Sequence, residues 1–249
     1  MNMKLYKSIL LVLLSVVLSS CTFTENIYIN DDGSGKFSFE MDGSSFMSMM
    51  PQDSLKSEKV IDSSFSFKQL FDEKRDSISK LPLLQQEKLK KLERFNIRTV
   101  MNPEKKEFLF SMTTDFIKIS DLGDAMSVVN EVQQASKSQV KNSALPEDVF
   151  GSNNSELKYS YDGKKFSRKA TLLKKEIIET EVDSMKQMMN MFYESSTYTL
   201  KYHFPKKVKK VSNSTALYSE DRKTITIEFP LSDYMKEPEK LNFEVEFEK

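Results

Sequence analysis

The chain is poor in the residues on which most catalytic and metal sites depend. Its 249 residues include one cysteine, one histidine and no tryptophan. A Ser-His-Asp or Cys-His arrangement therefore has only His203 to use. No cysteine-histidine cluster has zinc spacing, and none of the six glycines follows the GxGxxG or GxxxxGK pattern of a phosphate-binding loop. We therefore expect no enzymatic activity, no cofactor and no metal, and we expect His203 to be a surface residue.

The chain also lacks an excess of charge of either sign. Lysine plus arginine and aspartate plus glutamate both number 37. A dedicated nucleic-acid-binding protein would carry a strongly basic domain, so we expect no nucleic-acid partner. With 30% charged and 39% hydrophobic residues, the composition is that of an ordinary globular protein.

One apolar run is present, at the N-terminus, and it is too short to span a bilayer. Ile9–Leu18 follows Lys4 and Lys7 and contains no charge, which is typical of a secretory signal peptide. The run ends in Leu18-Ser19-Ser20-Cys21, and these residues resemble the lipobox of bacterial lipoproteins. The resemblance implies diacylation of the Cys21 thiol, cleavage before Cys21 and, usually, acylation of the new amine as well; palmitate is the acyl group we expect.

These features predict a signal peptide over residues 1–20 and a soluble body over 21–249 that is tethered to a membrane. Two or three acyl chains make a stable anchor. A buried apolar thiol is the alternative interpretation of Cys21. Because Thr22, rather than aspartate, follows Cys21, we expect the outer membrane of a two-membrane cell, with the body facing the periplasm.

Runs of alternating apolar and polar residues occur in pairs joined by turn sequences such as Asp31–Gly35, which is typical of β-hairpins. Asp31 and Asp32 also faintly resemble a calcium loop, but the later carboxylates of such a loop are missing. The alternating positions of the three predicted hairpins are Ile27, Ile29, Phe37, Phe39 and Met41; Ile97, Thr99, Met101, Phe108, Phe110 and Met112; and Leu157, Tyr159, Tyr161, Phe166, Arg168, Ala170 and Leu172.

Apolar residues at helical spacing follow the hairpins. They predict a short helix at 46–50, helices over 67–80 and 82–92, one from about Ser120, and one over 178–192. The C-terminal part reads mainly as strands, over 200–204, 225–229 and 241–247. We therefore predict an α+β fold: antiparallel sheets built from repeated hairpin–helix units, helices packed on one face, and a strand-rich C-terminus. The polar segment 140–155 is a possible internal break.

Two further sets of residues are candidates for binding. Met185, Met189 and Phe192 lie on one stripe of the predicted 178–192 helix, where they are core residues, the lining of a site for an apolar ligand, or thioether ligands for copper. Lys206, Lys207, Lys209 and Lys210 form the densest basic patch. This patch is either a solvated strand edge or a contact with anionic lipid or an acidic partner.

In layout, the chain is similar to the LppM-type lipoproteins. The features that carry this resemblance are the lipobox, the α+β body with its strand-rich C-terminus and the lack of a catalytic constellation. That resemblance implies a soluble domain that binds lipid-like ligands. We therefore predict a non-enzymatic, lipid-anchored envelope protein that binds an apolar, lipid-like ligand or a protein partner. The alternative is a structural or assembly accessory lipoprotein that acts through a strand edge or through the basic patch.

Overall fold

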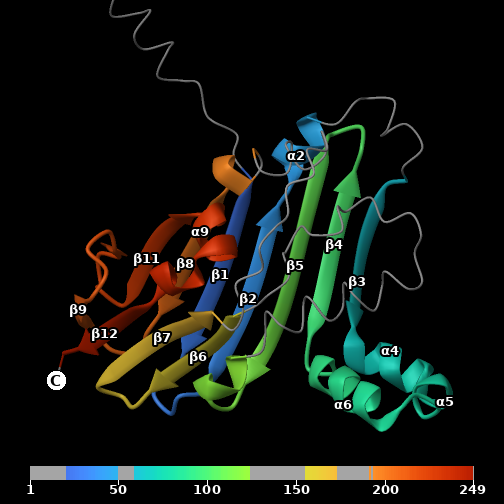
Figure 1. Ribbon diagram of the computed structural model, residues 1–249, viewed down its shortest axis with the longest axis horizontal. Helices are drawn as coiled ribbons and strands as arrows, with labels where there is room; N and C mark the ends of the chain where they lie inside the picture. Colours follow the sequence, from blue (N-terminus) through green and yellow to red (C-terminus); the bar gives the residue numbers. More distant parts are fainter. Residues whose placement is uncertain (1–20, 50–58, 124–154, 173–190, 192, 249) are drawn as a thin grey trace, which may run out of the picture.

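The computed structural model of the protein describes residues 21–49, 59–123, 155–172, 191 and 193–248. These residues form two β-sheets with short helices, and strands dominate the C-terminal part (Figure 1). The predicted α+β class is therefore confirmed. The predicted break near 140–155 falls almost wholly outside the described residues and stays a prediction.

The larger sheet has eight strands in the order β10-β11-β8-β1-β2-β5-β4-β3. Every neighbouring pair except β1 and β8 is antiparallel. Its strands are β1 (Thr22–Ile29), β2 (Gly35–Asp42), β3 (Ile61–Ser66), β4 (Asn96–Asn102), β5 (Glu107–Phe116), β8 (Thr197–His203), β10 (Leu217–Tyr218) and β11 (Thr224–Pro230).

The smaller sheet has four antiparallel strands in the order β6-β7-β12-β9. They are β6 (Ser155–Tyr161), β7 (Lys165–Leu172), β12 (Phe243–Phe247) and β9 (Val208–Val211). This sheet lies against the part of the larger sheet that contains β1 and β8 (Figure 1). Phe166 lies at the centre of the contact, with ring centroids 5.4 Å from Tyr202 and 5.3 Å from Phe204 of the other layer.

The described helices are short. They are α2 (Ser44–Met49), α4 (Phe67–Glu73), α5 (Arg75–Ile78), α6 (Leu83–Leu92), the 3-10 helices η1 (Ile119–Leu122) and η2 (Pro238–Leu241), and α9 (Leu231–Lys236). Helices α4 to α6 gather beyond one end of β3 and β4 (Figure 1). Pro82 stands at the N-cap of α6, directly before the first helical residue, where its missing N–H removes no hydrogen bond of the helix. The predicted helix over 178–192 lies outside the described residues except for Met191.

All three predicted hairpins are confirmed, as β1–β2, β4–β5 and β6–β7. In the first turn Gly33 has a φ of +81°, a conformation that favours glycine. The Asp32 carboxylate accepts hydrogen bonds from the backbone N–H and the hydroxyl of Ser34, at 3.0 and 2.6 Å. The acidic residues of this segment thus stabilise the turn.

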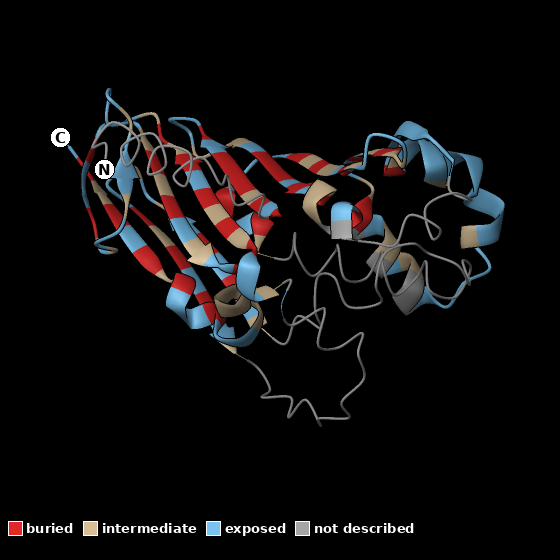
Figure 2. Ribbon diagram, turned by 90° about the horizontal axis from the view of Figure 1, so that it is seen from above, coloured by how far each residue is buried: buried red, intermediate tan, exposed pale blue. Residues whose placement is uncertain are grey.

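The two faces of the larger sheet differ sharply. On β1, Phe23, Glu25 and Ile27 face the smaller sheet and are buried, and the strands show regular stripes of burial (Figure 2). Thr22, Thr24 and Tyr28 point to the opposite side, because successive strand residues alternate. We call this second side the outer face. No described helix or strand covers it, since the smaller sheet and α9 lie on the other side (Figure 2).

Candidate functional site

Cys21 lies immediately before β1. Its carbonyl accepts a hydrogen bond from the Thr197 N–H at 3.1 Å, and its side chain is buried, with 2% exposed. This backbone bond ties Cys21 to the start of β8, so no flexible linker separates it from the middle of the larger sheet. Within the described residues, no helix is long and apolar enough to cross a membrane.

The basic patch lies at the opposite end of the strands. β8 begins beside Cys21 and runs parallel to β1, and Lys206 and Lys207 follow its far end. At about 3.3 Å per residue, the length of β8 separates Cys21 from these lysines by about 20 Å. Lys206 is partly engaged, since its Nζ donates to the Gly163 carbonyl at 2.9 Å. Lys209 and Lys210 lie exposed on β9.

The other sequence candidates divide between the described and undescribed parts of the chain. Met185, Met189 and Phe192 lie outside the described residues, so their roles stay predictions.

His203 is on the outer face, where its ring stacks on Tyr28 with centroids 3.9 Å apart and Nδ1 lies 3.0 Å from the Thr224 hydroxyl. Burial, followed by the charge of Lys201, lowers the pKa of His203. Among the described residues, no group of three or more His, Cys, Asp or Glu side chains could hold a metal ion.

The structure reveals a buried charged cluster between the two sheets. The Glu25 carboxylate accepts hydrogen bonds from three tyrosine hydroxyls: Tyr159 on β6 at 2.6 Å, Tyr198 on β8 at 2.8 Å, and Tyr202 on β8. The Arg168 guanidinium on β7 lies 3.7 Å from the same carboxylate. The side chains of Glu25 and Arg168 are almost completely buried. We call these five residues the inter-sheet cluster.

The protonation states within the inter-sheet cluster follow from burial and from the two opposite charges. Burial raises the pKa of Tyr159, Tyr198 and Tyr202 well above its usual value, and the Glu25 carboxylate raises it further. Burial alone would lower the pKa of Arg168, but the nearby Glu25 carboxylate holds it above its usual range. The tyrosines therefore remain hydrogen-bond donors and the arginine remains charged.

The inter-sheet cluster joins the two sheets. Its carboxylate is saturated by donors from both sheets, and Arg168 also donates to the Leu241 carbonyl at 3.1 Å. Breaking such a buried pair on one side leaves an uncompensated charge, which is strongly destabilising. The cluster therefore fixes the position of the smaller sheet on the larger one.

Sequence reasoning missed the inter-sheet cluster, although a signal was present. Glu25 occupies an inward position of the alternation that runs through Phe23 and Ile27. Arg168 occupies an inward position between Phe166 and Ala170. Two opposite charges at apolar positions of different hairpins indicate a buried ion pair, because an unpaired buried charge is too costly.

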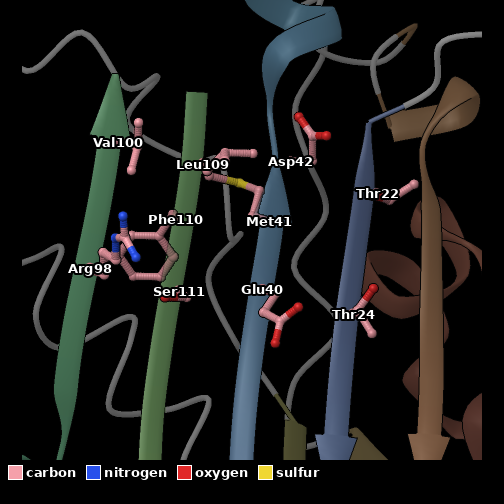
Figure 3. Close-up of a pocket in the computed structure, with 10 residues that line it drawn as sticks. All are labelled: Thr22, Thr24, Glu40, Met41, Asp42, Arg98, Val100, Leu109, Phe110 and Ser111. Atoms are coloured by element: carbon pink, nitrogen blue, oxygen red, sulfur yellow. The ribbon is translucent and has the colours of Figure 1, made fainter. Parts of the chain in front are cut away.

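A pocket of about 390 Å³ opens on the outer face (Figure 3). The strand register places its lining in two adjacent rows across β1, β2, β5 and β4. One row is Thr24, Glu40, Ser111 and Arg98, and the other is Thr22, Asp42, Leu109 and Val100. Met41 and Phe110 complete the lining. The second row includes Thr22, so the pocket lies at the Cys21 end of the sheet.

The pocket carries both signs of charge. Glu40 accepts a hydrogen bond from the Ser38 hydroxyl at 3.1 Å, and Asp42 accepts one from the Ser44 N–H at 3.0 Å. Arg98 lies two strands from Glu40, which is about 10 Å at the usual strand spacing. Its guanidinium forms a weak, exposed ion pair with Asp62 at 3.5 Å. The pocket therefore offers two carboxylates on β2 and a guanidinium two strands away on β4.

Comparison with known proteins gives one distant structural neighbour. No protein-family model matches the chain, and no curated protein matches it. The chain is similar to the folded domain of LppM from Mycobacterium tuberculosis, solved by NMR, with a TM-score of 0.42 and 6% sequence identity over 92% of this chain and 89% of that one. The predicted resemblance to LppM-type lipoproteins is thus supported by a remote structural similarity. A similarity of this size establishes no shared function. The lipid anchor stays a prediction.

Replacing Glu25 with glutamine should lower the free energy of unfolding by about 3–5 kcal/mol, because Arg168 would stay buried without a carboxylate. Urea denaturation followed by circular dichroism measures the change. The control is Glu156→Gln, which removes an exposed ion pair with Lys158 at 3.0 Å and should cost less than about 1 kcal/mol. Equal losses in the two variants would contradict the role given to the cluster.

The inter-sheet cluster also predicts loss of stability in alkali. The unfolded tyrosines deprotonate near pH 10, whereas the folded ones keep their protons because their pKa is raised. This stabilisation is complete below about pH 10 and is lost as the pH rises above it, by up to about 1.4 kcal/mol per pH unit for each tyrosine. Urea unfolding between about pH 8 and 12 measures this slope. Tyr159→Phe should make it shallower, whereas Tyr218→Phe, at an exposed residue, should leave it unchanged.

Proposed function

We propose that the chain is a non-enzymatic lipoprotein of the cell envelope that binds the zwitterionic head group of a membrane phospholipid. The observation that carries this proposal is the position of the mixed-charge pocket, at the same end of the larger sheet as Cys21. The proposed anchor and the proposed ligand site thereby face the same membrane surface.

The anchor is supported by the lipobox and by the way the sheet begins. Only the main-chain carbonyl of Cys21 takes part in the bond with Thr197, so acylation of the sulfur leaves that bond intact. The acyl chains require the Cys21 side chain to leave its buried position, and cleavage before Cys21 removes residues 1–20 from its vicinity. Because Thr22 follows Cys21, the membrane we propose is the outer membrane, with the body facing the periplasm.

The ligand class follows from the chemistry of the pocket. Glu40 and Asp42 suit an ammonium group, and Arg98 suits a phosphate, to which its guanidinium donates two hydrogen bonds. Val100 and Leu109 supply an apolar wall for the glycerol region of the lipid. The pocket volume of about 390 Å³ lies within the usual range for small-molecule sites.

Loss of the anchor thiol should prevent acylation. We expect Cys21→Ala to abolish palmitate incorporation, measured by metabolic labelling, because the thiol that would carry the acyl chains is gone. Ser19→Ala, which keeps a small residue in the lipobox, should behave like the parent chain. Undiminished labelling of Cys21→Ala would contradict acylation at Cys21.

Head-group binding can be tested on residues 22–249, which lack both the acylated thiol and the apolar run Ile9–Leu18, so that neither masks it. Vesicles containing phosphatidylethanolamine should bind this chain better than vesicles of phosphatidylglycerol. Arg98→Gln and Glu40→Gln should each weaken binding about tenfold, which is the effect of removing one charge-assisted hydrogen bond.

Lys210→Gln, on the smaller sheet, is the matched control and should bind normally. Soluble glycerophosphoethanolamine should compete with the vesicles only if the head group alone is recognised; a lack of competition assigns part of the affinity to the lipid surface. Binding that ignores both pocket substitutions would overturn the proposed site.

A further inference from the structure

Among the described residues, strand β3 leaves one edge of the larger sheet unpaired. It is the terminal strand, and β4 is its only strand neighbour within the described part of the chain. Large apolar side chains are exposed along it: Ile61 is 38% exposed and Phe65 is 40% exposed. An exposed edge of this kind is a template for pairing with another strand.

The hydrogen-bonding groups that face outward on β3 can be identified. The Phe67 N–H donates to the Phe95 carbonyl at 3.1 Å, in line with the β3–β4 register. In an antiparallel strand, the backbone N–H and C=O groups of successive residues point alternately to one side and the other. The N–H and C=O groups of Ile61, Ser63 and Phe65 therefore also point toward β4. The N–H and C=O groups of Asp62 and Ser64 therefore point away from the sheet.

The other strands at the sheet edges are protected in ways that β3 is not. β10 is only two residues long, β9 carries Lys209 and Lys210, and β6 carries Lys158. Short edges and lysines discourage pairing. β3 has no lysine, proline or bulge, and its one charge, Asp62, lies 3.5 Å from Arg98 of the neighbouring strand.

We propose that β3 pairs with β3 of a second copy of this chain, antiparallel and about a two-fold axis through Ser63. In this register Asp62 of each copy forms a hydrogen-bonded pair with Ser64 of the other, which uses the outward groups of both residues. Ile61 of each copy lies opposite Phe65 of the other, in the closer, non-hydrogen-bonded type of pair. The two exposed apolar side chains thereby cover each other.

The sequence of β3 selects this register over its neighbours. Centring the axis on Asp62 would place the two Asp62 carboxylates directly opposite each other, and like charges in that position are destabilising. Centring it on Ser64 would leave Phe65 opposite Ser63. Of these three registers, the one centred on Ser63 is the one that pairs apolar with apolar residues and separates the acids.

A disulfide test uses the full chain in intact cells. In the proposed dimer the two Ser63 Cα atoms lie about 4.5 Å apart, within disulfide range. We expect Ser63→Cys to give a disulfide-linked dimer under mild oxidation. The parent chain, which retains Cys21, and Lys158→Cys, at an exposed position of β6, should both stay monomeric.

A second substitution tests the edge itself. Ser64→Pro removes an outward N–H without touching the β3–β4 ladder, because the Ser64 N–H points away from β4. Added to Ser63→Cys, it should reduce the dimer about tenfold or more, since the symmetry removes two hydrogen bonds. Ile61→Lys, which breaks the apolar pair instead, should have a similar effect and stands in if the proline variant fails to fold.

Three outcomes would overturn the proposal: no disulfide-linked dimer from Ser63→Cys, a cross-link to a different protein, or a dimer that persists in both Ser64→Pro and Ile61→Lys. None of these readouts depends on the pocket or on acylation of Cys21. Failure of the dimer therefore remains distinguishable from failure of the proposed function.

Discussion

The fold depends on one buried interaction, the Glu25 carboxylate surrounded by three tyrosine hydroxyls and Arg168. The contact between the two sheets is otherwise aromatic and aliphatic, and apolar packing tolerates small shifts of one layer over another. The Glu25 carboxylate accepts hydrogen bonds from tyrosines on β8 and on β6. A shift of one sheet over the other would break some of these bonds and leave a buried polar group unpaired. We infer that the cluster contributes positional specificity more than net stability, since burying two charges offsets much of their attraction.

With the smaller sheet fixed on one side, no described helix or strand covers the outer face of the larger sheet or the outward edge of β3. The proposed anchor residue, the pocket, the basic patch and the open edge occupy separate places on this frame. Cys21 and the mixed-charge pocket lie at one end of the strands, the basic patch follows the other end of β8, and β3 forms the far edge. If the strands stand upright on the membrane, Cys21 and the lysines do not both touch it. The pocket, in contrast, stays beside the anchor in every orientation.

How far the sequence predicts this arrangement depends on the range of the interactions. The hairpins follow from local alternation and from turns such as Asp31–Gly35, so they are predictable, and an ion pair of Glu25 with Arg168 could have been inferred from charges at inward positions. β3 reads Ile-Asp-Ser-Ser-Phe-Ser, with little alternation in burial, and it is a strand because β4 pairs with it. The parallel pairing of β1 with β8 and the two rows of the pocket arise from long-range register, for which no local pattern exists.

The parallel pairing of β1 with β8 also has a mechanical meaning. β1 lies inside the sheet, with β8 on one side and β2 on the other, and the chain enters it directly from Cys21. A pull applied at Cys21 along the strand loads the hydrogen bonds of both ladders together in shear, instead of opening them one at a time like a zipper. If the proposed anchor at Cys21 holds the molecule, β1 would in this way resist extraction from the sheet by force.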